Sequence, residues 1–159
     1  MIETKDMPDN FDSIFHKAVE RVVANKFTIK MLLHNVKWGV KGDLFHQIQV
    51  FVDQQHETLY RHTEQLMERL HIHETGALVN SERVHELSEL PEYCGHKTTQ
   101  QSLQSLCHAF DKLIGLCCSA RLLAQVSTDA VTEELLSQQI SYYNAQYVCL
   151  RGIIINNKD

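Results

Sequence analysis

The chain has 159 residues, 43% of them hydrophobic, and its 15 Lys and Arg against 20 Asp and Glu give a formal net charge of −5. That length is enough for one domain with a sizeable core, so we expect a single domain over residues 1–159. The acidic balance argues against a generic nucleic-acid binder, which carries a basic patch. Apolar runs stay well below the roughly 18 residues that cross a bilayer, and residues 1–10 have no apolar signal-peptide core. We therefore expect a cytoplasmic protein without a membrane partner.

The cysteines and histidines form no obvious metal or redox motif. An odd number of scattered cysteines is typical of reduced thiols, and their spacing matches neither a zinc finger nor a CxxC pair. The five are Cys94, Cys107, Cys117, Cys118 and Cys149, and we expect the last four to be small core or interface residues of helices. Ten histidines are scattered along the chain, and only the His71 and His73 pair suggests adventitious metal binding.

Apolar residues recur at helical spacing in four long stretches of the chain. The predicted long helices span about 10–38, 43–72, 99–126 and 130–154, after a short tail at residues 1–8. A shorter helix is predicted at about 81–90, with Ser81 as its N-cap. Gly39 and Gly42 favour a turn after the first helix, and Asp43 is a candidate cap for the second. These elements predict an all-α fold, a four-helix bundle with a short extra helix between the second and third long helices.

The second long helix has one apolar face and one polar face when residues are placed at 100° per step. Its polar face carries regularly spaced acids: Asp53, Glu57, Glu64 and Glu68. Solvation alone accounts for a polar face, but carboxylates one or two turns apart also suit a hard cation or iron. In helix bundles, such sites are built from carboxylates and histidines that project from facing helices.

The segment Leu33–Gly42, LHNVKWGVKG, resembles the Dps-type mini-ferritins of the ferritin-like superfamily. The family pattern is close to LHNxHWxVxG, and Phe45, Asp53 and the Glu68–Arg69 pair follow it in register without gaps. By helix order the resemblance covers nearly all of the chain. It implies a ferritin-like bundle that assembles into a dodecamer, a cage around a cavity that holds iron. It also implies iron binding, iron storage and protection against oxidative stress.

The resemblance further implies a ferroxidase metal site at each two-fold interface, with ligands from two subunits. The matching positions are Lys37, Gln49 and Asp53 from one subunit, and Glu64 and Glu68 from the other. Both histidine ligands are replaced, and the three acids remain as residual metal-ligand positions. An ammonium has no lone pair, and an amide oxygen is a weak ligand. We therefore expect weak or absent ferrous oxidation, with Lys37 in an ion pair with Asp53, Glu64 or Glu68 in the metal's place.

Alternative functions remain open at this point. An active ferroxidase could use a shifted metal site in which His34, His46 or His56 joins the acids, so whether the chain is a ferroxidase-type enzyme is undecided. A structural cage or interaction protein without metal, and an unrelated helical bundle, are further alternatives.

The resemblance leaves DNA binding and ion entry open as well. In the family a lysine-rich tail often carries DNA binding, and neither end of this chain has one. DNA contacts would therefore be weak and sensitive to salt. Asp129, Glu133 and Glu134 are candidates to line a three-fold pore, although acids also favour a helix start for capping reasons.

Overall fold

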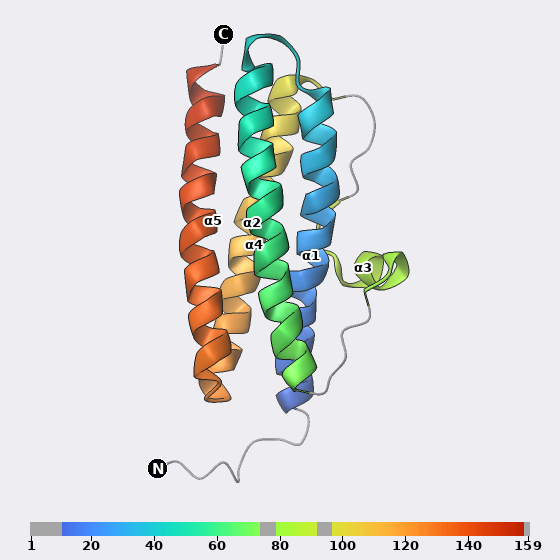
Figure 1. Ribbon diagram of the computed structural model, residues 1–159, viewed down its shortest axis with the longest axis vertical. Coiled ribbons are helices and arrows are strands. Elements are labelled where there is room, and N and C mark those ends of the chain that lie inside the picture. The colour runs from blue at the N-terminus through green and yellow to red at the C-terminus, as the bar shows by residue number, and fades with distance from the viewer. Residues whose placement is uncertain (1–10, 74–78, 92–96, 158–159) are drawn as a thin grey trace.

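The computed structural model describes residues 11–73, 79–91 and 97–157, and its main feature is a bundle of four long helices (Figure 1). The long helices are α1 (Phe11–Gly39), α2 (Phe45–Ile72), α4 (Thr99–Val126) and α5 (Ala130–Asn156). A 3-10 turn, η2 (Gly42–Leu44), precedes α2, and the short helix α3 (Ser81–Leu87) lies between α2 and α4. The described ranges contain no strand. The predicted all-α bundle with a short extra helix is confirmed.

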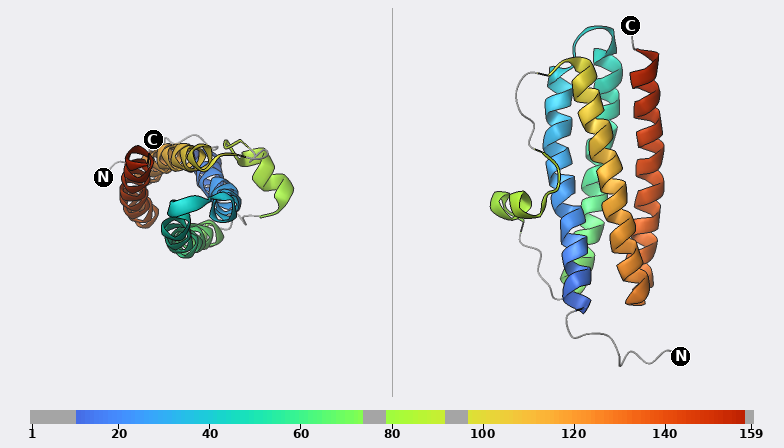
Figure 2. Two further views of the ribbon diagram at one scale, coloured as in Figure 1. Left: turned by 90° about the horizontal axis from the view of Figure 1, so that it is seen from above. Right: turned by 180° about the vertical axis from the view of Figure 1, so that it is seen from behind.

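Seen along its axis, the bundle has a simple arrangement (Figure 2). Helix α1 packs beside α2 and α4, and α5 packs beside α4 and α2. Helix α3 stands outside the bundle against α1. The end of α1 and the start of α2 therefore lie side by side, as do the start of α1 and the end of α2.

The apolar stripes of the four long helices meet in one core. Its fully buried members include Val22, Ile29, Leu33, Ile48, Leu66, Leu103, Phe110, Leu113, Leu136 and Leu150. Phe45, which the helical pattern places on the core face of α2, is instead 38% exposed because it lies at the corner where α2 begins.

The helix ends lie within three residues of the predicted ones, but two of the predicted caps are wrong. Asp43 lies inside η2, and α2 starts after Leu44 without a side-chain cap. Asn80, not Ser81, caps α3 by accepting a hydrogen bond from the Arg83 amide. At the first turn, Gly42 has φ of +81°, a conformation that a residue with a Cβ rarely adopts.

Several sequence expectations concern cysteines, tails and membranes. The predicted tail at residues 1–8 and Cys94 lie outside the described residues. Cys117 is a buried free thiol of the core, Cys107 and Cys118 are half-buried, and Cys149 is exposed. Within the described ranges, no helix combines the length and the apolar character that a membrane span requires.

Candidate functional site

Lys37 and Asp53 form an ion pair across the α1–α2 corner. Lys37 lies in the last turn of α1, and its Nζ is 2.5 Å from Oδ1 of Asp53 in the third turn of α2. The ammonium is also 5.4 Å from the centroid of the Trp38 ring, within the range of a cation–π contact. The side chains of Lys37 and Asp53 are 21% and 59% exposed, so the pair is open to water on the Asp53 side. The ion pair predicted for Lys37 is therefore present, with Asp53 as the partner.

The remaining positions of the expected metal site lie along α2. Gln49 is half-buried and sits one turn before Asp53. Glu64 and Glu68 are exposed and line a shallow hollow together with Tyr60 and His71. Asp53 and Glu64 are eleven residues apart on one helix, which corresponds to about 16 Å at 1.5 Å per residue. Asp53 and Glu64 of one chain are therefore too far apart to bind the same ion. A metal site that uses both positions requires a second copy of the chain.

The histidines of a shifted site lie near the corner but are not assembled into a metal centre. His56 is half-buried, whereas His34 and His46 are exposed. Burial lowers the pKa of His56, the charge of Lys30 lowers it further, and Asp53 opposes both. His56 therefore lies within the electrostatic range of Asp53. Among the described residues, no group of three His, Cys, Asp or Glu side chains is arranged to hold a metal ion.

A second polar cluster lies inside the bundle, where the sequence pattern did not predict one. Lys26 of α1 is 1% exposed, and its Nζ donates a hydrogen bond to Oε1 of Gln139 on α5. His62 Nδ1 on α2 lies 2.9 Å from the hydroxyl of Tyr143, and Gln139 Nε2 donates to the His62 carbonyl at 3.2 Å. Burial lowers the pKa of Lys26 to about 8, with Cys117 opposing the shift. Because these contacts link α1, α2 and α5, the cluster fixes the centre of the bundle.

The chemistry of this core does not fit a metal centre in the middle of the bundle. Di-iron centres in bundle cores use Glu side chains from facing helices together with His. The buried polar residues of the described ranges include no Asp or Glu; they are Asn25, Lys26, Gln55, His62, Thr63, Ser102, Thr132 and Gln139. A basic amine at this place repels a cation instead of binding it.

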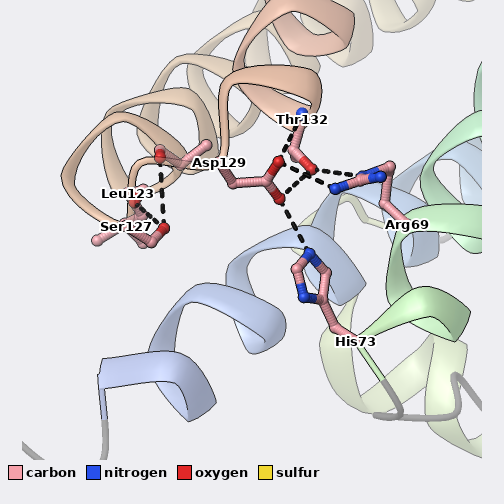
Figure 3. Close-up of polar contacts among 7 residues, drawn as sticks. Arg69, His73, Leu123, Ser127, Asp129 and Thr132 are labelled. Carbon is pink, nitrogen blue, oxygen red and sulfur yellow. Dashed lines mark hydrogen bonds and ion pairs between the residues drawn. The ribbon is translucent and has the colours of Figure 1, made fainter. Parts of the chain in front are cut away.

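A third cluster closes the opposite end of the bundle from the α1–α2 corner (Figure 3). Asp129 is the N-cap of α5, where it accepts a hydrogen bond from the Thr132 amide. The Asp129 carboxylate also accepts from Arg69 Nη2 and from His73 Nε2, each at 3.0 Å. Its side chain is 9% exposed. The Asp129 carboxylate is therefore engaged by side chains of its own chain. Glu134 is exposed and accepts a hydrogen bond from Gln138, and a three-fold pore lined by Asp129, Glu133 and Glu134 stays a prediction.

Comparison with known proteins places this arrangement in a family. A family model described as the ferritin-like domain matches residues 16–146. Among solved structures, Dps from Bacillus brevis is 20% identical, with a TM-score of 0.87 over 93% of this chain and 99% of that chain. Dps from Thermosynechococcus elongatus is 14% identical, with a TM-score of 0.86 over 91% of this chain and 92% of that chain.

A third similar structure is Dps from Vibrio cholerae O1, described as a member of a broad superfamily of ferritin-like diiron-carboxylate proteins. It is 17% identical, with a TM-score of 0.85 over 91% of both chains. A search of curated protein sequences finds no match. At these identities the similar structures establish the fold, and the family model covers more than half of the chain. The chain therefore belongs to the ferritin-like domain family and has the fold of the Dps-type mini-ferritins.

Proposed function

We propose that the protein is a Dps-like, iron-binding cage subunit whose two-fold oxidation site is altered, so that ferrous oxidation there is weak or absent. The observation that carries this proposal is the ion pair between Lys37 and Asp53. The family resemblance puts an imidazole at the position of Lys37, and the pair engages the carboxylate that would otherwise hold the metal.

The chemistry of the replaced ligands supports the loss of oxidation. Ferrous iron needs lone pairs from imidazole and carboxylate ligands, with open positions for the oxidant. Lys37 offers no lone pair while it is an ammonium, and its charge repels an incoming cation. Gln49 offers only a neutral amide oxygen. Glu64 and Glu68 keep their carboxylates, so the face retains the means to attract iron without the ligands that activate an oxidant.

Exposed apolar side chains at the end of α1 and along α2 support assembly. Trp38 and Tyr60 are 62% and 61% exposed, and Val50 and Phe45 are 46% and 38% exposed. Exposed apolar groups of this size, beside polar residues, mark contact surfaces in soluble proteins. We propose that a second copy covers them across a two-fold axis and that the assembly is a dodecamer in the cytoplasm. Its role is iron storage and protection against oxidative stress, with at most weak, salt-sensitive DNA binding.

Anaerobic loading of the purified assembly with ferrous iron, followed by peroxide or dioxygen, tests the proposal. We expect slow growth of ferric absorbance, and rapid growth would overturn the altered-site assignment. The double variant Lys37→His with Gln49→His should raise the rate. The matched control Lys17→His with Gln47→His changes the same residue types at exposed positions of the same helices, away from the α1–α2 corner or on the opposite side of α2, and should not. A rate that is equal in both double variants contradicts the ligand positions.

A shifted site at His56 is the second candidate, because this half-buried imidazole lies within the electrostatic range of Asp53 and His34. It predicts rapid oxidation by the unmodified protein that His56→Ala abolishes. Gel filtration addresses assembly separately: elution as a single chain would contradict the cage.

A further inference from the structure

Two histidines from different helices face each other at the end of the bundle where α1 begins and α2 ends. His16 lies in the second turn of α1, and His73 directly follows α2. Their ring centroids are 5.1 Å apart, and the ring planes are inclined by 38°. Both side chains are half-buried, and the Phe15 ring packs against both. The pair therefore combines partial shelter from water with access for a small ion.

The Asp129 carboxylate fixes the orientation of the His73 ring, with Nε2 of His73 3.0 Å from Oδ2 of Asp129. An ionised carboxylate only accepts, so Nε2 of His73 carries the proton that it donates to Asp129 (Figure 3). Nδ1 is then the ring nitrogen with which His73 would bind a metal. A carboxylate behind a histidine is the arrangement that orients imidazoles that ligate metals.

The spacing of the rings fits a shared ion. Two imidazole nitrogens at about 2.1 Å from a tetrahedral metal place their ring centroids about 5 Å apart, and the observed separation is 5.1 Å.

We propose that His16 and His73 bind a borderline transition-metal ion such as Zn²⁺, separate from the two-fold site, with Asp12 as a third ligand. Asp12 is exposed and lies one turn before His16 on the same face of α1. Glu20, one turn after His16, is already paired with Arg83 Nη2 at 2.7 Å. Three ligands are not preassembled among the described residues, so Asp12 rotates towards the ion and water completes the coordination.

Such an ion would connect the start of α1 to the end of α2 beside the α4–α5 turn. A ligand that binds only the folded state stabilises it in proportion to the logarithm of its concentration over Kd. Zinc binding at this pair therefore predicts a higher melting temperature together with a single equivalent of bound metal per chain.

Calorimetric titration of the chelator-treated full-length assembly with ZnCl₂ near neutral pH tests the site. We expect a saturable equivalent per chain in the unmodified protein that His16→Ala and His73→Ala each remove, along with the zinc-dependent rise in melting temperature. His108→Ala, at an exposed position on α4, is the matched control and should retain both. Absence of saturable zinc binding in the unmodified protein, or its retention in both histidine variants, overturns the proposal.

Two further measurements keep the test independent of the proposed function and of folding defects. The triple variant Asp53→Asn, Glu64→Gln, Glu68→Gln removes the two-fold acids and should keep the zinc equivalent. Loss of that equivalent in the triple variant would place the zinc there and refute the histidine site. Co²⁺ added to the unmodified protein should give visible bands of tetrahedral nitrogen ligation, and His16→Ala, checked for helix content by circular dichroism, should lack them. Identical Co²⁺ spectra for the two proteins would contradict ligation by His16.

Discussion

Lys26 of α1 holds its Nζ 5.5 Å from the centroid of the Tyr143 ring of α5, in the interior of the bundle. Lysine is almost never fully buried unless it is paired, and here the partners are a neutral amide oxygen and an aromatic face. No carboxylate is among the buried polar residues of the described part of the chain. The charge of this amine is therefore opposed by burial alone, and this has a measurable effect on stability.

The stability of the protein should rise with pH as Lys26 loses its proton. The folded-state pKa is about 8, against an ordinary value of 10.5, so between these values the unfolded chain binds more protons than the folded chain. The free energy of unfolding should then increase by up to about 3 kcal/mol across this window. Urea unfolding at a series of pH values measures it. Lys26→Met should remove this segment of the profile, and an unchanged profile in that variant would exclude Lys26 as its source.

Acid should destabilise the protein through His62. Burial, followed by the charges of Lys26 and Arg61, lowers the pKa of His62 from 6.5 to about 4. The stabilising contribution is therefore complete above pH 6.5 and is lost as the pH falls towards 4, at a cost of about 2–3 kcal/mol. The same urea series, extended to acid, measures the loss. In His62→Gln the profile should be flatter over this range; a slope equal to that of the unmodified protein would refute the assignment.

The Lys37–Asp53 pair should contribute little to stability, whatever it does to metal binding. Asp53 is 59% exposed, and exposed ion pairs contribute from zero to about 1 kcal/mol. Lys37→Met should therefore change the free energy of unfolding by less than about 1 kcal/mol. This result, from chemical denaturation, would show that any change in iron chemistry at position 37 is not a consequence of unfolding. A loss of several kcal/mol would mean that the pair is a structural element.

Substitution of Asp129 should destabilise the folded protein more than most substitutions near the surface. Asp129→Ala removes the N-cap of α5 and leaves Arg69 and His73 without their shared acceptor. We expect a loss of about 2–4 kcal/mol. Asp129→Asn keeps an oxygen for the Thr132 amide and loses only the charge, so its cost should be about half as large. Thermal unfolding of both variants at one protein concentration gives the comparison, and equal losses would indicate that the cap contributes nothing.

The helices could be predicted from the sequence because their signals are local: helical stripes repeat within each segment. The family resemblance predicts an ion pair of Lys37 with Asp53, Glu64 and Glu68 all open as partners, and the structure pairs it with Asp53, sixteen residues away across one turn. The burial of Lys26 could not be predicted, because its acceptor Gln139 lies 113 residues away. A lysine beside an apolar stripe usually extends its amine to solvent. Asp129 shows the same limit: its partners Arg69 and His73 lie 60 and 56 residues away, so the pattern at the start of the helix does not reveal them.

The buried amine also limits how the helices can move. Sliding α1 along α5 by one helical turn displaces a side chain by about 5.4 Å, which would take the Lys26 Nζ away from both Gln139 and Tyr143 and leave it unsatisfied in an apolar interior. An all-apolar interior tolerates several such alignments, whereas the Lys26 contacts favour one. Although α1 packs directly against α2 and α4 and not against α5, Lys26 therefore ties the height of α1 to that of α5 across the interior, and with it the position at which the α1–α2 corner presents Lys37 to a neighbouring subunit.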